Sequence, residues 1–418
     1  MHRRRPASAL LLAGLLLTSP CLIRAQNGDG AAPPEWHQWR GPNRDGVSAE
    51  TGLLQSWAED GPPREWRVRL GTGYSGMAVS QGRLFTLYAD SESEYAAAFD
   101  VRDGSRVWRV RLGPRFENEW GDGPRATPTV DAQRVYVVSG SGFLMALATA
   151  DGRELWGIDL PRAFGGHPPD LGYSNSPLLL DGRLFVTTGG RHSRAFAALD
   201  KADGRVIWEG HTDPPGYSSP IAVTVDGVPQ VIFFAGASAR GLAPDDGEML
   251  WRVAWPNSAN ENVATPVFVA PDRVFLSAAH RGGARMLRLR LQGDVFQAET
   301  VWHSRVMKNH FSSCVYYQGY IYGSDRSTLK CIDPQDGSEK WSTRGFGEGS
   351  LVAAEGRLYI LGTYGKLALA EATLEAYREI SSFQAVNGKT YTPPALSGAR
   401  LYLRSTSELT SLNIRRPD

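Results

Sequence analysis

LATADGRELW, at residues 147–156, returns almost unchanged as FDVRDGSRVW at 99–108 and LDKADGRVIW at 199–208. In each copy an apolar, alternating run leads into an Asp-Gly pair, and a second run after the pair contains a Trp. Asp-Gly between two alternating runs indicates a tight turn, because glycine adopts positive φ angles without steric cost. Each copy therefore predicts two strands joined by a turn.

The same phrase is repeated along most of the chain. Clear copies follow at 242–251 and 332–341, and weaker ones change the turn residues but still end on an aromatic residue. The closing aromatics lie 36 to 52 residues apart: Trp66, Trp108, Trp156, Trp208, Trp251, Trp302, Trp341 and Tyr377. A repeat of this length made of short strands is typical of propeller blades. The fold class predicted is all-β, an eight-bladed β-propeller of four-stranded antiparallel blades.

The second repeat shows how one blade divides into strands. Its strands are predicted at 125–131, 134–140, 143–149 and 154–160, joined by short turns as in a meander. The predicted blades span 74–112, 125–160, 173–212, 216–255, 262–306, 310–345, 347–380 and 390–416.

The last repeat lacks a fourth strand, and EWRVRL at 65–70 is an outer strand with no blade in front of it. If this N-terminal strand completes the C-terminal blade, the ring has no free edge. We expect this closure.

The N-terminus predicts an export signal. Three Arg residues precede the apolar run Ala9–Leu17, which is too short to span a membrane, and Ala25 offers a cleavage site. Cys21 follows Pro20, which fits lipid modification poorly. Removing residues 1–25 removes four Arg and no acidic residue, so 45 − 4 = 41 basic residues face 44 acidic ones. This balance predicts no nucleic-acid partner. The export signal predicts a protein of the periplasm or the extracellular space.

The export signal and the extent of the repeat divide the chain into three segments: a signal peptide at 1–25, an N-terminal extension at 26–63 and the propeller at 64–418. The extension is rich in Pro and Gly, carries three Trp residues and lacks the repeat. We expect it to pack across one face or the outer edge of the ring, or to plug one end of the axial channel.

The two other cysteines, Cys314 and Cys331, are placed on the first and third strands of one blade. Strands two positions apart are about 9.6 Å from each other, which exceeds the roughly 7 Å Cα separation that a disulfide spans. We expect two separate thiols.

The Trp that ends each repeat is interpreted as a structural residue. A large ring on the outermost strand can cover the Gly-containing turn of the next blade and bury about 150–250 Å² there. Stacking on a base or a sugar is the alternative role for these rings.

Ala198, Asp200, Asp203, Gly204 and Trp208 together resemble the tryptophan-docking repeat of the PQQ-type propellers. HQWRGPNRDGVS at 37–48 and the phrases GPRATP, NHFSS and YTPP resemble exported PQQ-binding-like β-propeller repeat proteins. The resemblance covers about 36–416. The superfamily also includes quinoprotein alcohol dehydrogenases and BamB-type outer-membrane assembly scaffolds, so the resemblance implies the fold but not one activity.

A quinoprotein dehydrogenase requires a clamped quinone, Ca²⁺ with oxygen ligands and a carboxylate base. In the resembling alcohol dehydrogenases a disulfide between adjacent cysteines is one side of the clamp, and this chain has no Cys-Cys pair. Glu261 and Asn262 are the residues that Ca²⁺ would use, but neighbours on a strand point to opposite faces. We therefore predict no cofactor, with PQQ and Ca²⁺ as the alternative.

No other metal or catalytic motif is found. The histidines are scattered, without the paired spacing of zinc ligands, and GYSSP at 216–220 lacks the second Gly of a serine hydrolase elbow. We predict no metal site and no catalytic residue.

The mouth of the axial funnel remains as the candidate ligand site, because the first strand of each blade lines the axis. The alternative is a polar rim that holds only water. The residues predicted to open these strands are Tyr74, Arg125, Tyr173, Asn175, Tyr217, Glu261, Asn262, Asn309, His310, Glu348, Lys389 and Tyr391.

The sequence therefore predicts an exported, monomeric, non-catalytic propeller that binds a protein or a small molecule through its funnel or faces. The alternative is a divergent quinoprotein dehydrogenase for alcohols or sugars, and a third hypothesis is an outer-membrane assembly scaffold.

Overall fold

The structure is a computed structural model that describes residues 35–190, 192–255, 259–280 and 282–417. The predicted signal peptide at 1–25 lies outside the described residues. The described residues belong to one compact unit, Pro34–Asp418. Within that unit, strands dominate and a short helix, α1 (Leu160–Phe164), follows the second blade.

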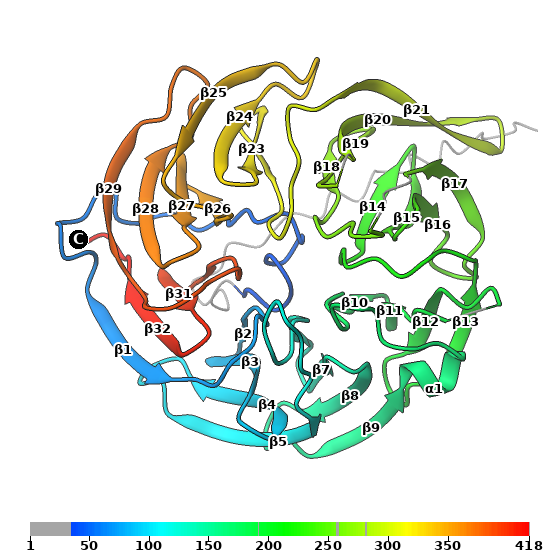
Figure 1. The fold of residues 1–418 in the computed structure, drawn as a ribbon, viewed down its shortest axis with the longest axis horizontal. Helices are drawn as coiled ribbons and strands as arrows, with labels where there is room; N and C mark the ends of the chain where they lie inside the picture. Colours follow the sequence, from blue (N-terminus) through cyan, green and yellow to red (C-terminus); the bar gives the residue numbers. More distant parts are fainter. Residues whose placement is uncertain (1–34, 191, 256–258, 281, 418) are drawn as a thin grey trace, which may run out of the picture. The chain divides into compact units, whose positions relative to one another are not determined.

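The strands form eight four-stranded antiparallel sheets arranged in a ring (Figure 1). The predicted eight-bladed propeller is confirmed. Blades 1 to 4 contain β2 (Ala78–Ser80), β3 (Arg83–Ala89), β4 (Ser93–Asp100), β5 (Arg106–Pro114); β6 (Thr129–Val130), β7 (Arg134–Val138), β8 (Phe143–Ala148), β9 (Glu154–Asp159); β10 (Leu178–Leu180), β11 (Arg183–Thr187), β12 (Phe196–Asp200), β13 (Val206–Gly210); and β14 (Ile221–Val225), β15 (Val228–Phe234), β16 (Ser238–Leu242), β17 (Met249–Ala254).

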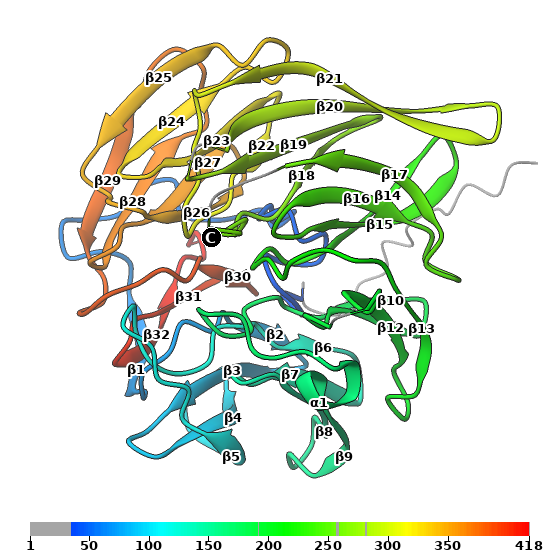
Figure 2. The same cartoon turned by 45° about the vertical axis from the view of Figure 1, so that its right-hand side comes forward.

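Blades 5 to 8 repeat the same order. They contain β18 (Val267–Val269), β19 (Arg273–Ala278), β20 (Gly283–Gln292), β21 (Val295–Ser304); β22 (Val315–Tyr317), β23 (Tyr320–Asp325), β24 (Thr328–Ile332), β25 (Glu339–Arg344); β26 (Ser350–Ala354), β27 (Arg357–Leu361), β28 (Lys366–Glu371), β29 (Glu379–Gln384); and β30 (Ala395–Ser397), β31 (Arg400–Arg404), β32 (Glu408–Asn413), β1 (Arg64–Arg69). The hairpin of β20 and β21 is long and extends outward in the turned view of Figure 2.

The ring closes as the sequence predicted. β1 pairs antiparallel with β32, so the N-terminal strand is the outer strand of the C-terminal blade. The buried Arg404 of β31 reaches into blade 1, where its guanidinium donates to the carbonyl oxygens of Ser75, Leu87 and Gly73 at 2.9, 2.7 and 3.0 Å. Backbone pairing thus completes blade 8, and the Arg404 side chain holds blade 8 against blade 1.

The inner strands are shorter than the sequence analysis predicted. In blade 2 a strand was expected from residue 125, but β6 begins only at Thr129, directly after Pro128. The inner strands of four other blades also begin one residue after a Pro: Leu178, Ile221, Val267 and Ala395. Proline has no N–H to give to a ladder, so it stands at the first position before pairing begins. The residues ahead of it form loops at the funnel mouth.

The closing tryptophans lie between blades. The rings of Trp66, Trp108, Trp156, Trp208 and Trp302 lie against the turn glycines of the following blades. Each of these five indoles also donates its N–H to a backbone carbonyl there, as Trp208 does to Pro244 at 3.0 Å.

The other three aromatics follow the pattern less closely. The indole of Trp341 donates to the Thr373 carbonyl of the next blade at 2.7 Å, without a turn glycine beneath it. Trp251 donates to Gln230 inside its own blade at 2.6 Å, and Tyr377 packs back on Trp341 with ring centroids 5.7 Å apart. Blades 5 and 7, which follow Trp251 and Trp341, do not repeat the Asp-Gly turn at the corresponding place, so neither indole covers a turn glycine.

The segment that precedes β1 crosses the middle of the ring, drawn in blue in Figure 1. The backbone of Trp36 pairs with Val79 of blade 1, and the guanidinium of Arg44 donates to the Ser176 and Pro177 carbonyls ahead of β10 at 2.8 Å each. On the far side, Ser48 N–H donates to Ala353 of blade 7 at 2.9 Å. The segment thereby ties blades on opposite sides of the axis together.

Both described cysteines are buried and unpaired, as the sequence predicted. Burial raises the pKa of the Cys314 thiol to about 12, and that of Cys331 to about 12 as well. Of the residues that the structure describes, none belongs to a helix with the length and apolarity needed to cross a bilayer.

Candidate functional site

A cavity of about 120 Å³ lies at the funnel mouth. Loops ahead of the inner strands of several blades form its wall, and the crossing N-terminal segment contributes Trp39. The indole of Trp39 donates to Thr265 Oγ1 at 2.8 Å, which fixes that ring against blade 5. The residues around the cavity are Trp39, Tyr74, Trp120, Arg125, Leu171, Ser174, Tyr217, Ser219, Val263, Phe311, Ser313 and Tyr391.

Aromatic rings from three blades form a continuous row beside this cavity. The ring centroids of Tyr74 and Tyr391 are 5.5 Å apart, and those of Tyr391 and Phe311 are 5.0 Å apart. Phe311 in turn lies 3.8 Å from the imidazole of His310. Centroid separations of about 4.5–7 Å are those of favourable aromatic pairs. The row presents flat apolar surfaces on which a planar ligand can stack.

Two cations accompany the row of rings. The guanidinium of Arg125 lies 5.9 Å from the Tyr74 ring centroid and 5.0 Å from that of Phe116, and it donates to the Gly121 and Gly123 carbonyls. Burial lowers the pKa of Arg125 without neutralising it at physiological pH. The ammonium of Lys389 lies 5.2 Å from the Tyr391 centroid, and its hydrogen bond with Tyr391 raises the pKa of Lys389. Arg125 and Lys389 thus bring two positive charges to this part of the mouth, where the carboxylates of Glu94 and Asp122 also act on Arg125.

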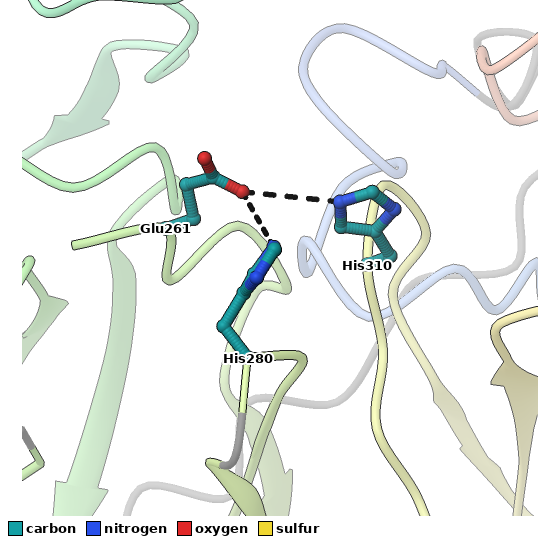
Figure 3. Close-up of side chains that lie close together, drawn as sticks. All are labelled: Glu261, His280 and His310. Carbon is teal, nitrogen blue, oxygen red and sulfur yellow. Dashed lines mark ion pairs between the residues drawn. The ribbon is translucent and has the colours of Figure 1, made fainter. Parts of the chain in front are cut away.

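Carboxylates and imidazoles gather at blades 5 to 7 (Figure 3). Glu261 Oε2 lies 2.7 Å from His280 Nε2 and 3.8 Å from His310 Nε2. The other ring nitrogen of His310, Nδ1, is hydrogen-bonded to Glu348 at 3.0 Å. We call Glu261, His280, His310 and Glu348 the His-Glu cluster. The ring of His310 connects it to the aromatic row.

Four of the predicted funnel residues are structural. Tyr173 is 1% exposed and donates to the Thr188 carbonyl at 2.6 Å, so it belongs to the core. The buried amides of Asn175, Asn262 and Asn309 donate to the backbone carbonyls of Ser218, Ala235 and Ser324 at 2.6, 2.6 and 3.0 Å. These residues hold the loops in place.

The other predicted residues do gather at the mouth. Arg125, Tyr217 and Tyr391 line the cavity, Lys389 lies over Tyr391, and Glu261, His310 and Glu348 form most of the His-Glu cluster. Glu261 therefore meets two histidines and not the amide of Asn262, which was its expected partner for Ca²⁺.

His280 was not among the predicted residues because it lies in the turn between β19 and β20, outside the loops that lead into inner strands. In a meander, however, this hairpin turn returns to the same face as those loops. Phe311 follows His310 directly and was missed because only polar residues and tyrosines were considered. Trp39 was not assigned to the funnel because the path of the N-terminal segment is invisible in the repeat pattern.

Comparison with known proteins bears on the family and the fold of this chain. The family described as outer membrane protein assembly factor BamB matches residues 92–343. The dehydrogenase subunit of the quinone-type alcohol dehydrogenase of Komagataeibacter europaeus is 28% identical over 253 residues, which are 56% of this chain and 32% of that protein. The chain thus spans about a third of the length of this curated relative.

Solved structures are similar in fold at low sequence identity. BamB from Moraxella catarrhalis has a TM-score of 0.59 at 14% identity, covering 88% of this chain and 99% of the other. A europium-containing methanol dehydrogenase has a TM-score of 0.65 at 10% identity, covering 89% and 90%. The family match extends over more than half of the sequence, across blades 1 to 6, and the structure supplies the eight PQQ-like blades around it. The chain therefore belongs to the family of PQQ-like β-propellers that is described as outer membrane protein assembly factor BamB.

Proposed function

We propose that this propeller is a binding protein whose axial cavity takes a small, planar, negatively charged molecule. The observation that carries the proposal is the row of Tyr74, Tyr391 and Phe311 with the Arg125 guanidinium at one end. Flat rings favour a planar ligand, and a fixed guanidinium favours an acid group on it.

The contacts of Arg125 suggest how it would orient the ligand. Two carbonyls, of Gly121 and Gly123, accept from its terminal nitrogens and restrict the rotation of the guanidinium. A guanidinium has five N–H groups, so others remain for a carboxylate. A hydrogen bond to a charged group contributes about 1.5–3 kcal/mol, which corresponds to roughly a 10- to 100-fold change in affinity.

A fluorescence titration tests this proposal. Trp39 and Trp120 lie in the cavity wall and report on occupancy, so the purified protein is titrated with planar aromatic mono-, di- and tricarboxylates. Saturable quenching is expected, weakened roughly 10- to 100-fold by Arg125→Gln. Tyr391→Leu removes a stacking surface and should weaken binding as well.

The matched control is Arg153→Gln, at an exposed turn on the hairpin between β8 and β9. This variant should bind like the parent protein. If no planar acid binds at high micromolar concentration, or if Arg125→Gln binds as tightly as the parent, the assignment of the cavity is wrong.

The similarity to a quinone-type alcohol dehydrogenase favours a second candidate, a quinoprotein oxidoreductase. The residues present fit that cofactor only in part. The aromatic row suits a planar quinone, but Cys314 is buried beside Asn309 at 3.2 Å and offers no disulfide clamp. Asn262 donates both described hydrogen bonds to backbone carbonyls, and Glu261 faces histidines. An oxygen-rich Ca²⁺ site is therefore not assembled from the Glu261-Asn262 pair.

The two candidates are separated in one tube by adding pyrroloquinoline quinone with Ca²⁺ and a dye-linked alcohol oxidation readout. Turnover of alcohols would establish the dehydrogenase. Quinone binding without turnover agrees with a binding protein that accepts planar acids.

We also propose that the protein is exported and monomeric, with its funnel or faces available to a protein partner as in an assembly scaffold. N-terminal sequencing of the protein from a periplasmic fraction tests the removal of residues 1–25. Light scattering on the purified protein tests the monomer, and crosslinking in cells tests for a membrane-barrel assembly partner.

A further inference from the structure

We propose that Glu261, His280 and His310 form a binding site for a divalent transition-metal ion of the Zn²⁺ class, with Glu348 as the residue that orients His310. This goes beyond ligand binding by the aromatic row and stands independently of it. The three side chains come from the loop before β18, the β19–β20 turn and the loop before β22. They converge from two neighbouring blades, as Figure 3 shows.

The spacing of the three ligand atoms is close to that of a metal-bound set. Glu261 Oε2, His280 Nε2 and His310 Nε2 all lie within 4.8 Å of one another, with two separations of 2.7 and 3.8 Å. Metal–ligand distances of about 2.0–2.2 Å in a tetrahedron place neighbouring ligand atoms about 3.3 Å apart. The two distances from Glu261 bracket this value, and the two imidazoles, whose ligand atoms are at most 4.8 Å apart, would draw closer together around a bound ion.

The contact between His280 and Glu261 itself points to a missing partner. Nε2 of His280 is buried, and although it lies 2.7 Å from the carboxylate oxygen, the pair lacks the alignment of a hydrogen bond. An imidazole nitrogen without an aligned proton acceptor is suited to donate its lone pair to a cation. The backbone of His280 also has a φ of +49°, a conformation that few residues other than glycine adopt and that sets the direction of this ring.

Glu348 supplies the outer interaction that metal-binding histidines require. Its carboxylate accepts from Nδ1 of His310 at 3.0 Å, which places the proton of the neutral ring on Nδ1 and the lone pair on Nε2. Nε2 is the atom that faces Glu261 and His280. A carboxylate–histidine–metal arrangement of this kind fixes both the tautomer and the ring orientation.

The charges agree with a divalent cation. Glu261 and Glu348 bring two negative charges, and the two imidazoles are neutral as ligands, so one divalent ion neutralises the His-Glu cluster. Two nitrogen donors and one carboxylate favour Zn²⁺, Fe²⁺ or Co²⁺ over Ca²⁺, which prefers six to eight oxygen ligands. Without a metal, the same cluster would be a set of side-chain contacts in which Glu261 and Glu348 flank His310, and the experiment distinguishes the two.

The site lies next to the cavity, through the contact of His310 with the lining residue Phe311. Three protein ligands leave a fourth tetrahedral position for water or for an exogenous donor. The ring of His310 lies 3.8 Å from Phe311, which lines the cavity, and the charge of Glu261 contributes to the raised pKa of the cavity residue Tyr217, after burial as the main cause.

The experiment is a metal titration of the full protein after dialysis against a chelator. Calorimetry with ZnCl₂ should give one equivalent, CaCl₂ should give none, and CoCl₂ should produce the visible absorption of a four- or five-coordinate ion. His280→Ala and His310→Ala should each lower the Zn²⁺ affinity at least tenfold, and Glu261→Gln should do the same with almost no change in side-chain size.

Glu348→Gln tests the orienting role separately. It should lower the Zn²⁺ affinity about 10- to 100-fold and alter the Co²⁺ spectrum while the stoichiometry stays at one. The matched control is His303→Ala, at an exposed position of β21 in the same blade as His280, which should bind Zn²⁺ like the parent.

Thermal unfolding with and without Zn²⁺ covers the case in which an alanine variant folds poorly. The parent should show a metal-dependent rise in its unfolding temperature, and Glu261→Gln should lose that rise. No Zn²⁺ uptake at high micromolar concentration would overturn the proposal and leave the cluster as a set of side-chain contacts. Uptake that is equal in the parent and in both histidine variants would also overturn it, because the ion would then sit elsewhere.

Discussion

The docking of Trp208 on the turn of the next strand pair can be measured with two glycines of the same blade. Gly247 has a φ of +75°, and a Cβ added there would lie 2.7 Å from the Trp208 ring. Gly227 has a φ of +79°, and a Cβ there would meet no atom within 4 Å. Both Gly247→Ala and Gly227→Ala therefore force alanine into a left-handed backbone conformation. Only Gly247→Ala also brings a Cβ into steric conflict with the Trp208 ring.

The magnitudes follow from these two terms. A left-handed conformation costs a non-glycine residue about 1–2 kcal/mol, and this cost lowers the stability of both variants. Overpacking against a rigid ring adds about 1–3 kcal/mol for Gly247→Ala alone. The free energy of unfolding should thus fall by about 1–2 kcal/mol for Gly227→Ala and by about 2–5 kcal/mol for Gly247→Ala.

Urea unfolding followed by circular dichroism measures both losses. The decisive comparison repeats the two substitutions in a Trp208→Leu background, where the ring is gone and the difference between them should nearly vanish. Equal losses in the parent background, or a difference that persists without the ring, would refute the interpretation of the indole as the contact between blades.

Three further predictions concern buried groups. Because burial raises the pKa of Cys314 to about 12, its thiol should not react with iodoacetamide at pH 8 in the native protein and should react after unfolding. Asp213 and Arg240 form a buried ion pair, so Asp213→Leu leaves a buried cation without its partner and should lower the free energy of unfolding by about 3–5 kcal/mol, with partial recovery in the Asp213→Leu, Arg240→Leu double variant. Burial raises the pKa of Glu94 above 4.5, so the folded protein binds the carboxyl proton more tightly than the unfolded chain does. The stability that this proton contributes is fully present below pH 4.5 and is lost as the pH rises through the pKa of the folded protein. Glu94→Gln should remove this slope, which a series of urea titrations from pH 4 to pH 7 would detect.

The repeat made the architecture predictable because each blade encodes its own turn and its own ring. Asp203-Gly204 and Trp208 lie on one hairpin, formed by β12 and β13, so local chemistry sufficed to predict that pair of strands. The closure by β1 followed from counting strands, since the last repeat lacked one. The start of the inner strands was mispredicted because Pro128 and its equivalents were read as part of the strand.

The residues that line the funnel were only partly predictable, because the direction in which a side chain points matters more than its position in the sequence. Asn262 and Glu261 are adjacent, yet one amide turns to the backbone of blade 4 and the other side chain to the histidines. His280 and His310 are thirty residues apart and meet only because two blades stand side by side. No spacing rule for a single element can reveal such a pair.

Pairing of β1 with β32 has a consequence for the order in which the molecule is made. Arg67 and its partner Glu408 are separated by 341 residues, so β1 is synthesised long before β32, the strand with which it pairs. Blades of local contacts can form as the chain grows, but the slow, non-local step comes at the end. A chain that stops short of β32 keeps an unpaired strand and two open sheet edges that favour aggregation. A chain that ends before β32 therefore cannot close the ring.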